Sequence, residues 1–248
     1  GKPTPPGVVH RDVVYREGAF GSKRLDIYEP TGTYSRGEAP VVVFFHGGSW
    51  IKGDKIMIRI IDRFLNRMRE AGYFLIAVNY TTTPLLGLEG PRRNSEAAIR
   101  WIRENSEIYG WDEKNLGLYG VSAGGHLALL ALSTMEDTPF AFGFIECAPT
   151  DLIAMREGDA FDSSWVFRLL PEERLRALSP VNHIREEQAP VLIFHGDADT
   201  TVHLDQSRIY AEAARERGAT VELQVYQGGD HAFLNFPDEM WRRQEERA

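Results

Sequence analysis

The sequence predicts an α/β fold in which a mostly parallel central sheet carries helices on both faces. Four runs of strand length are apolar throughout, as expected for strands that lie between helices. These runs span residues 41–45, 74–78, 142–145 and 191–194. Segments with helical spacing of apolar residues separate them, and this alternation of strand and helix predicts parallel neighbours joined by helical connections.

The helical segments share one feature, which is a glycine directly behind each of them. They span residues 56–71, 94–109 and 204–217, and the glycines are Gly72, Gly110 and Gly218. Glycine readily adopts the left-handed conformation that ends a helix. Each segment is therefore expected to be a helix with a defined end.

Segments of alternating apolar and polar residues flank this core. They span residues 12–16, 24–29 and 220–226. Such alternation is typical of strands with one exposed face. The first two segments predict antiparallel strands at the N-terminal edge of the sheet, and Pro30 ends the second of them.

The composition is that of a soluble globular protein with one substantial core, because the 248 residues are 43% hydrophobic and 26% charged. The length predicts a single domain over residues 1–248, with a small helical insertion at 151–183 over the functional edge of the sheet. The formal net charge of −8 argues against a nucleic-acid surface. No stretch reaches the roughly 20 apolar residues of a membrane span.

The chain begins at Gly1 with neither an initiator Met nor an apolar signal core, so we expect a trimmed or mature chain. The sequence leaves the compartment open between the cytoplasm and secretion. The single cysteine, Cys147, follows an apolar strand and is expected to be a small buried residue without a chemical role.

The strongest chemical signal is Gly120-Val-Ser122-Ala-Gly124, which stands between an apolar strand and an apolar helix. A serine on such a sharp turn adopts a strained backbone, and bulky residues two positions away on either side would collide. Glycine at both positions removes these collisions. The hydroxyl then lies beside the amino end of the helix, where developing negative charge is favoured. We predict Ser122 as a nucleophile, against the alternative of a structural serine in a Gly-rich turn.

A serine hydroxyl needs a base near neutral pH, and the chain has seven histidines. His231 follows the last alternating strand and a glycine turn, so it can reach over another loop at the same sheet edge. The remaining histidines have more ordinary structural explanations: His10, His46, His126, His183, His195 and His203. We predict His231 as the base, and a plain loop histidine is the alternative.

The base in turn needs a carboxylate that holds its tautomer. The buried strand at 191–194 leads into a loop with two of them, Asp197 and Asp199. Asp199 stands further into the loop and can point towards His231, whereas Asp197 is better placed to brace the turn. We predict Asp199 as the partner of His231, and the chain order Ser, Asp, His is that of one large hydrolase fold.

Acyl transfer to a serine also requires donors for an oxyanion, usually backbone amides. The apolar run 41–45 leads into His46-Gly-Gly-Ser-Trp50, a glycine-rich turn whose amides can converge. We predict Gly48 and Ser49 as the main donors of an oxyanion hole, Gly47 close behind, and the amide of Ala123 as well. Whether Gly47 or Ser49 supplies the second amide of the turn stays open, and a simple tight turn is the alternative.

Together these segments resemble the single-domain carboxylesterases related to hormone-sensitive lipase, and the kynurenine formamidases beside them. The matching pieces are residues 46–54, 119–128, 195–199 and 229–233, in the expected order. The resemblance implies the α/β-hydrolase fold. It also implies a catalytic triad of Ser122, Asp199 and His231, and an oxyanion hole made by the His46 turn and Ala123.

Two features depart from the usual pattern of that family. The family often has His-Gly-Gly-Gly, so Ser49 at the fourth position is expected to avoid a positive φ. Its larger members carry a helical cap ahead of the first oxyanion strand, and about forty residues precede that strand here, which predicts a minimal cap. Four candidate pocket walls, for each of which core packing is an equal alternative, are Trp50, Leu85, Trp165 and Phe233.

We therefore predict a serine carboxylesterase that hydrolyses short-chain or aryl esters, of the acetyl or feruloyl type, through an acyl-enzyme. The expected partner is a small-molecule or carbohydrate-linked ester. We expect neither nucleic-acid binding nor a membrane span. A homodimer is compatible with the sequence. No cofactor and no metal are expected, because the chain has neither a phosphate loop nor metal-ligand spacing.

Three alternatives remain. An arylformamidase acting on N-formylkynurenine fits the same turn. A peptidase fits less well, because the chain lacks the large extra domain of the oligopeptidases. From another class comes a non-catalytic receptor or adhesion module of the same fold, although such modules usually lose a triad member.

Overall fold

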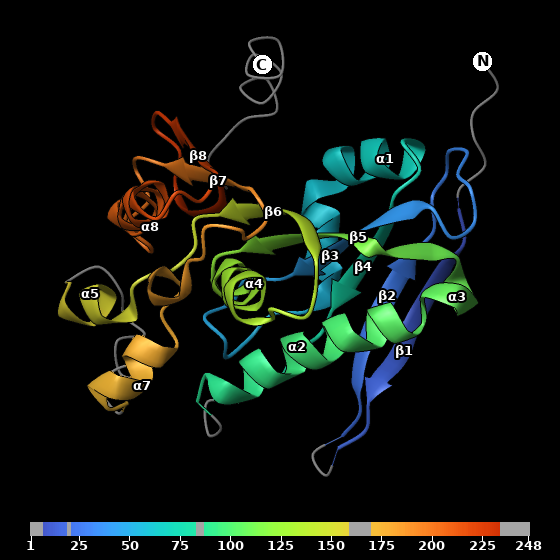
Figure 1. Cartoon of the computed structure of the whole chain (residues 1–248), viewed down its shortest axis with the longest axis horizontal. Coiled ribbons are helices and arrows are strands. Elements are labelled where there is room, and N and C mark those ends of the chain that lie inside the picture. The colour runs from blue at the N-terminus through green and yellow to red at the C-terminus, as the bar shows by residue number, and fades with distance from the viewer. Residues whose placement is uncertain (1–6, 19–20, 83–86, 159–169, 234–248) are drawn as a thin grey trace.

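The computed structural model describes residues 7–18, 21–82, 87–158 and 170–233 (Figure 1). Its centre is an eight-stranded sheet with the order β1-β2-β4-β3-β5-β6-β7-β8. The strands are β1 (Val9–Arg16), β2 (Lys23–Tyr28), β3 (Ala39–Phe45), β4 (Phe74–Val78), β5 (Trp111–Val121), β6 (Phe140–Glu146), β7 (Val191–Gly196) and β8 (Val221–Tyr226).

The strand directions confirm the predicted fold class. β1 pairs with β2, and β2 with β4, in antiparallel fashion, whereas all other neighbours are parallel. The antiparallel strands are those at the N-terminal edge, as their alternating sequence predicts. The α/β-hydrolase fold is thus present, with a mostly parallel sheet.

Helices and short helical turns connect the strands. They are η1 (Lys55–Ile61), α1 (Asp62–Glu70), α2 (Glu89–Glu104), α3 (Ser106–Tyr109), α4 (Ala123–Thr134), α5 (Leu152–Glu157), α7 (Glu172–Ala177), η3 (Pro180–His183), α8 (Asp205–Glu216) and η4 (His231–Phe233). Among the described stretches of the chain, none of these helices combines the length and apolarity that a bilayer crossing requires.

Two helices begin differently from the sequence prediction. The helix expected from residue 56 starts as the 3₁₀ helix η1, and its α-helical part begins only at Asp62. The first part is rich in isoleucine, whose branched side chain lowers helix propensity, and 3₁₀ turns are common at helix starts. α2 begins at Glu89, ahead of the expected residue 94, because Pro91 is tolerated in the first turn.

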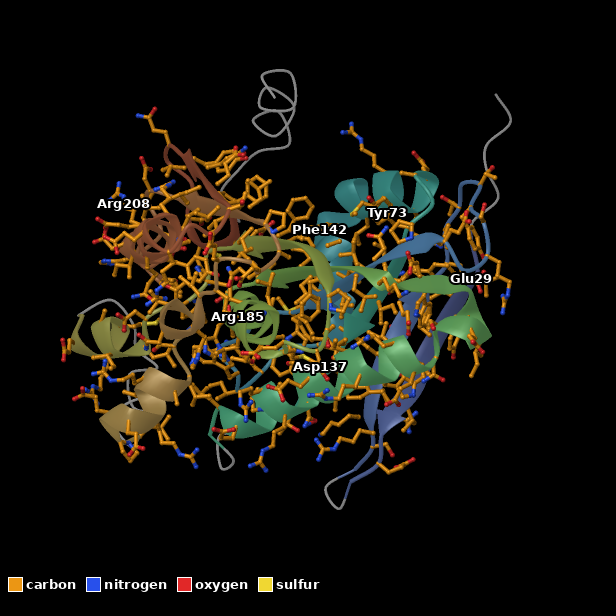
Figure 2. All side chains as sticks on the ribbon, in the orientation of Figure 1. Glu29, Tyr73, Asp137, Phe142, Arg185 and Arg208 are labelled. Carbon is orange, nitrogen blue, oxygen red and sulfur yellow. The ribbon has the colours of Figure 1, made fainter. Side chains whose placement is uncertain are left out.

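The central strands β3 and β4 are buried on both faces of the sheet. On one face, Val41, Val43 and Phe45 of β3 belong to a core with residues of α2, α4 and α8. On the other face, Val42 and Phe44 pack with Leu65 of α1. Successive strand residues point to opposite faces, so the continuous apolar run of β3 is explained by cover on both sides. Figure 1 shows α1 and α2 on opposite sides of the strands, and Figure 2 shows side chains filling the space between the layers.

The loops with the predicted chemistry leave one edge of the sheet. Phe45 at the end of β3 pairs with Gly120 of β5, and Val121 pairs with Glu146 at the end of β6. Glu146 pairs in turn with Phe194 of β7. These registers bring the carboxyl ends of four parallel strands together, which is where ligands bind in open α/β sheets.

The described part of the segment predicted as a helical insertion contains three short helical elements. α5, α7 and η3 all lie within residues 151–183, and residues 159–169 between them are outside the described part. α5 is capped by Asp151, whose Oδ1 accepts the N–H groups of Ile153 and Ala154 at 3.0 Å each. Whether this segment covers the functional edge stays a prediction.

Candidate active site

Ser122 occupies the turn between β5 and α4, with φ 54° and ψ −120°. A non-glycine residue at such angles costs roughly 1–3 kcal/mol and persists only where the surroundings hold it. One restraint is the N–H of Ser122, which donates to the main-chain oxygen of Glu146 at 2.8 Å. The residue is 8% exposed.

Glycines make this turn sterically feasible. A Cβ at Gly120 would lie 2.3 Å from the main-chain oxygen of Gly124. A Cβ at Gly124 would lie 2.0 Å from the main-chain oxygen of Phe45. Because Gly124 has no Cβ, the start of α4 can approach the end of β3, the strand that leads into the predicted oxyanion turn.

The structure brings the three predicted residues into one hydrogen-bonded row. Nε2 of His231 lies 2.9 Å from Oγ of Ser122, and its Nδ1 lies 2.8 Å from Oδ2 of Asp199. An ionised carboxylate only accepts, so Nδ1 of a neutral His231 carries the proton and Nε2 is left to accept from the serine hydroxyl. This is the arrangement that a serine nucleophile and its base require.

The loop after β7 holds Asp199 in its ionised form. Oδ1 accepts the N–H groups of Thr201 and Val202 at 2.9 Å each, and the residue is 5% exposed. Burial opposes ionisation, but hydrogen bonds from His195, His231 and Val202 outweigh it, and the pKa of Asp199 lies well below its usual value. Asp199 therefore carries a negative charge at any pH at which the protein would act.

Asp197, the carboxylate that the sequence assigns to bracing, supports the neighbouring loop. Its Oδ1 accepts the N–H of Gly228 at 2.7 Å, while the main-chain N–H of Ala198 donates to Gly229 at 3.0 Å. A Cβ at Gly196 would lie 2.0 Å from the main-chain oxygen of Gly229. The loop that precedes His231 is thus fastened to the loop that carries Asp199.

His195 is a functional residue that the sequence reasoning missed. It is fully buried, and its Nε2 lies 2.8 Å from the main-chain oxygen of Val202 and 3.2 Å from Oδ2 of Asp199. Its Nδ1 lies 2.6 Å from Oγ of Ser207. Since the carbonyl only accepts, the proton is on Nε2, and this one N–H is shared between the Val202 oxygen and the more distant Asp199. The place of His195 at the end of β7, four residues before Asp199, is the signal that could have identified it.

The predicted oxyanion turn has three successive residues with positive φ. Gly48 has φ 120°, Ser49 φ 55° and Trp50 φ 60°. The expectation that Ser49 avoids a positive φ is therefore wrong, because the left-handed region near +55° is open to residues with a Cβ at a modest cost. At Gly48 glycine is needed, since a Cβ there would lie 2.1 Å from the main-chain oxygen of Lys52.

Hydrogen bonds to the carbonyls of this turn orient its amides. Nδ1 of His46 donates to the Gly47 oxygen at 2.7 Å. The N–H groups of Ile51 and Lys52 donate to the Gly48 oxygen at 3.1 and 3.0 Å. The C=O and N–H of one trans peptide point in opposite directions, so these bonds turn the N–H groups of Gly48 and Ser49 away from the body of the turn. A Cβ at Gly47 would lie 3.4 Å from Cβ of Ser122, which places the turn beside the nucleophile.

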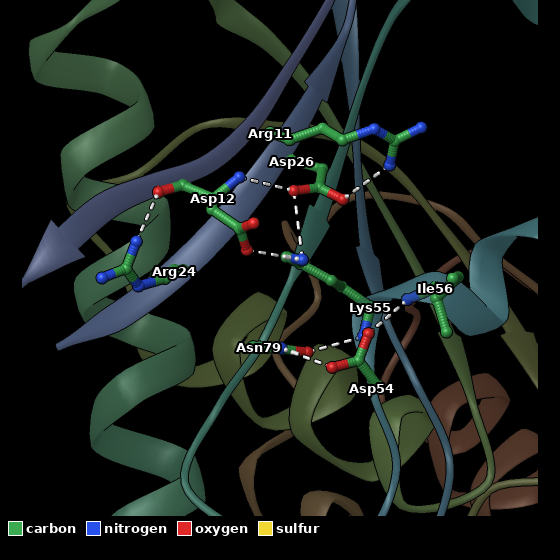
Figure 3. Close-up of polar contacts among 8 residues, drawn as sticks. All are labelled: Arg11, Asp12, Arg24, Asp26, Asp54, Lys55, Ile56 and Asn79. Carbon is green, nitrogen blue, oxygen red and sulfur yellow. Dashed lines mark hydrogen bonds and ion pairs between the residues drawn. The ribbon is translucent and has the colours of Figure 1, made fainter. Parts of the chain in front are cut away.

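A polar cluster anchors the far end of the turn to the strands beside it (Figure 3). Nζ of Lys55 lies 3.0 Å from Oδ1 of Asp12 and 3.2 Å from Oδ1 of Asp26, which is 2% exposed. Asn79 accepts the N–H of Lys55 through Oδ1 at 2.5 Å and donates from Nδ2 to Asp54 at 2.9 Å. Burial opposes the charge of Lys55, but its two carboxylate partners outweigh this and raise its pKa. The cluster joins the turn to β1, β2 and the end of β4.

Trp50, a candidate pocket wall, lies in the core at 2% exposure. Its Nε1 donates to Nδ1 of His126 at 3.1 Å, and Nε2 of His126 lies 2.8 Å from the main-chain oxygen of Leu178. These partners fix a neutral His126 with its proton on Nε2. Burial lowers the pKa of His126 to about 4, although the bond to Leu178 opposes this. His126 thus holds the end of the oxyanion turn through Trp50.

The other candidate walls have different outcomes. Phe233 is 4% exposed and packs edge to face on Tyr226 with 5.2 Å between the ring centroids, so it too is packed in the interior. Leu85 and Trp165 lie outside the described residues. For Trp50 and Phe233 the structure shows the core packing that was the alternative.

Cys147 is fully buried, as expected, and burial raises the pKa of its thiol well above the usual value. It follows the last residue of β6 with φ 41°. Its Sγ, a carboxylate oxygen of Asp199 and a ring nitrogen of His231 all lie within 4.8 Å of one another. The thiol therefore packs directly against the row of predicted catalytic residues.

An α/β-hydrolase sheet with a hydrogen-bonded serine, histidine and aspartate at its carboxyl edge defines the class, which is the α/β-hydrolase-fold proteins that carry the three residues of a serine-type triad. Within that class the chain belongs to the prolyl oligopeptidase family, whose model matches residues 93–247. The BD-FAE model matches residues 25–146.

Curated relatives are esterases. The chain is 29% identical to Esterase LipQ of Mycobacterium tuberculosis over 230 residues, which cover 84% of this chain and 54% of LipQ. It is 26% identical to the isoprenylcysteine alpha-carbonyl methylesterase ICME of Arabidopsis thaliana over 254 residues, which cover 93% of this chain and 58% of ICME. The chain thus spans about half the length of these relatives.

Solved structures of similar proteins also include esterases. The thermophilic esterase Est2 of Thermogutta terrifontis superposes with a TM-score of 0.76 at 28% identity, covering 98% of this chain and 90% of Est2. Its butyrate-bound form gives a TM-score of 0.76 at 28% identity, covering 98% of this chain and 91% of that one.

Proposed function

We propose that this protein hydrolyses carboxylic esters through an acyl-enzyme formed on Ser122. The observation that carries the proposal is the row in which Nε2 of His231 lies 2.9 Å from Oγ of Ser122 and Nδ1 lies 2.8 Å from Oδ2 of Asp199. All three members are present and paired, which argues against a non-catalytic module of the same fold. The relatives named above are esterases, and none of them is described as a formamidase.

In the first half of the reaction, Oγ of Ser122 attacks the ester carbonyl carbon while Nε2 of His231 takes the hydroxyl proton. The negative charge of Asp199 stabilises the imidazolium that results. The C–O bond to the alcohol then breaks as His231 returns the proton to the leaving oxygen. An acyl group remains on Ser122.

In the second half, a water molecule replaces the alcohol. Nε2 of His231 takes a proton from the water, whose oxygen attacks the acyl carbonyl, and the bond to Oγ of Ser122 breaks. The acid leaves and the serine recovers its proton. One base therefore serves both halves of the reaction, which requires only that its tautomer is held by Asp199 throughout.

The oxyanion of each tetrahedral intermediate requires donors that are fixed in advance. We assign this role to the N–H groups of Gly48 and Ser49 in the turn after β3, with Gly47 beside them, and to that of Ala123 at the start of α4. Their support is the proximity of the turn to Ser122 and the hydrogen bonds that orient its peptides. The amino end of α4 adds a favourable dipole.

We further propose that the preferred substrates carry short acyl or aryl groups, of the acetyl or feruloyl type, on a small alcohol or a carbohydrate. Structures of the related Est2 contain propionate and butyrate, which are short acids. The BD-FAE match over residues 25–146 covers the oxyanion turn and the nucleophile. The two short acids bound to Est2 favour small acyl groups over long lipid chains.

The proposal is tested by turnover of a graded set of esters. We expect p-nitrophenyl acetate and butyrate to be hydrolysed faster than the dodecanoate. Ser122→Ala should lower kcat/KM by several orders of magnitude and leave the melting temperature unchanged. Ser133→Ala, a buried serine elsewhere on α4, is the matched control and should retain turnover. A proline p-nitroanilide serves as the peptidase arm, and turnover of this amide above that of the esters would refute the esterase assignment.

A further inference from the structure

Ser207, in the first turn of α8, contacts the site through a second imidazole. Its Oγ lies 2.6 Å from Nδ1 of His195, whose Nε2 lies 3.2 Å from Oδ2 of Asp199. Ser207 is 1% exposed and His195 is fully buried. The mechanism above uses neither side chain in a bond-making step. A hydroxyl this deeply buried is not available as a nucleophile, so its link to the site is its contact with His195.

The contacts of Ser207 extend the row of predicted catalytic residues beyond Asp199. Nδ1 of His231 lies 2.8 Å from the same Oδ2 of Asp199, and Nε2 of His231 lies 2.9 Å from Oγ of Ser122. Two hydroxyl–imidazole pairs therefore share one carboxylate oxygen. The side chain of His231 in the first pair is 22% exposed, whereas the second pair is enclosed. An enclosed pair can orient the carboxylate without meeting a substrate.

The acceptors around His195 fix which of its nitrogens carries the proton. The main-chain oxygen of Val202 lies 2.8 Å from Nε2 and only accepts, as does the ionised carboxylate of Asp199, so the proton is on Nε2. Nδ1 is then an acceptor, and the hydroxyl of Ser207 donates to it. A buried acceptor that loses its donor is costly, so removal of this hydroxyl favours a shift of the ring.

His195 also supports the loop that holds the other oxygen of Asp199. The N–H of Val202 donates to Oδ1 of Asp199 at 2.9 Å, and the main-chain oxygen of Val202 receives the N–H of His195. A shift of the imidazole therefore disturbs Oδ2 directly and Oδ1 through Val202. Since Oδ2 holds the tautomer and orientation of His231, a displaced carboxylate lets this base turn away from Ser122.

We propose that His195 and Ser207 form a positioning pair, in which Ser207 holds the imidazole of His195 and this imidazole sets the position of Asp199 against the base. The inference rests on the proposed esterase function and deepens it, because it adds two residues that act on His231 without touching the substrate. It also gives the start of α8 a role in catalysis. The main chain there is fixed, since the N–H of Ser207 donates to the oxygen of Leu204 at 3.0 Å.

The first test compares turnover of p-nitrophenyl acetate in His195→Met, Ser207→Ala and the double variant. His195→Met fills the space of the ring without its N–H, and should lower kcat roughly tenfold or more with KM nearly unchanged. Ser207→Ala should lower kcat roughly three- to tenfold. The double variant should lose no more than His195→Met alone, because Ser207 acts on Asp199 only through His195.

A conservative variant and a control separate positioning from a general loss of structure. In His195→Gln a side-chain N–H can take the place of the Nε2 donor, so most of the kcat lost in His195→Met should return. Ser133→Ala removes another buried hydroxyl, on α4, and should leave kcat unchanged. Losses that add in the double variant would show that Ser207 and His195 act separately, and would overturn the inference.

Proton NMR reads the position of Asp199 without turnover. The proton between Nδ1 of His231 and Oδ2 of Asp199 should give a strongly downfield signal, because a close hydrogen bond deshields its proton. The signal should move upfield in Ser207→Ala and stay unchanged in Ser133→Ala. An unchanged signal in Ser207→Ala would also overturn the inference. Absence of turnover in the unaltered protein, with the signal moving as expected, would overturn the esterase proposal alone, so the two failures are distinguishable.

Discussion

Nε2 of His195 lies 3.2 Å from Oδ2 of Asp199, the same oxygen that Nδ1 of His231 approaches at 2.8 Å. The carboxylate is therefore held between a buried imidazole behind it and the proposed base in front. The two main-chain donors on Oδ1 complete its surroundings. A carboxylate with four donors is fixed in position and in charge, which is what a group that orients a base requires.

Asp199→Asn should lower kcat/KM for ester hydrolysis by roughly 10⁴-fold with little loss of structure. The amide can present an N–H to His231, which favours the tautomer with the proton on Nε2, and that tautomer cannot accept from Ser122. The measurement is kcat/KM on p-nitrophenyl acetate, with circular dichroism to show that the fold persists.

Asp197→Asn is the matched control for this prediction. It alters the neighbouring carboxylate, whose partner is the N–H of Gly228 in the loop before His231. The side-chain oxygen of Asn still accepts that bond, so we expect activity within a few-fold of the unaltered protein. Equal losses in the two variants would contradict the assignment of Asp199 as the partner of the base.

Gly48→Ala should damage the oxyanion turn. The residue has φ 120°, and the added Cβ would lie 2.1 Å from the main-chain oxygen of Lys52, so the turn must move. Loss of one oxyanion donor costs roughly 10²- to 10³-fold in kcat. Burst kinetics with p-nitrophenyl acetate should show slower acylation together with an unchanged number of titratable sites.

Gly37→Ala is the control for Gly48→Ala. It introduces the backbone strain of a positive φ at a position away from the oxyanion turn. Gly37 has φ 86° and nothing within 4 Å of the added Cβ, and it lies in the loop before β3. We expect a loss of about 1 kcal/mol in the free energy of unfolding and no change in kcat. If both glycine variants keep full kcat, the turn does not supply the oxyanion donors.

His126 should make the stability of the protein depend on pH. Its pKa falls from the ordinary value of 6.5 to about 4 on folding, because the ring is buried. The unfolded chain therefore binds a proton between these values that the folded chain does not, and stability falls as the pH drops from about 6.5 to about 4. Between pH 7 and 4.5 this residue contributes a loss of about 2 to 3 kcal/mol in the free energy of unfolding.

The contribution of His126 is measured as a difference between variants. Urea unfolding of His126→Gln at pH 7 and pH 4.5 should show a pH dependence reduced by that amount, although the variant is less stable at pH 7. His183→Gln replaces a partly exposed histidine near the protein surface and should keep the full pH dependence. The same slope in all three proteins would show that His126 is not the neutral buried group described here.

The strand pattern and the order of chemical residues could be predicted from the sequence, because each depends on local signals. Continuous apolar runs mark strands covered on both faces, and the glycines around Ser122 mark the sharp turn. The position of η1 could not be predicted, since its apolar stripe fits a 3₁₀ helix and an α-helix almost equally. The positive φ of Ser49 was also not predicted from the sequence, because it follows from the hydrogen bonds of Gly48 with Ile51 and Lys52 rather than from residue type.

The supporting residues of the site are harder to recognise than the row itself. His126, His195 and Glu146 act through contacts with residues distant in sequence or across a loop, namely Trp50, Ser207 and Tyr119. Nothing in the immediate sequence of His126 distinguishes it from a packed residue of α4. His195 and Glu146 share a weak signal, since each is a polar residue at the end of a strand.

The central claim is that Ser122 becomes covalently bonded to the acyl group, and covalent labelling tests it most directly. Structures of the related Est2 include a form phosphorylated by paraoxon, so paraoxon is a suitable probe. After incubation, mass spectrometry of the digested protein should find one adduct, on the peptide that contains Ser122, with loss of ester turnover in proportion to labelling. An adduct on another serine, or full turnover in protein labelled at Ser122, would contradict the account.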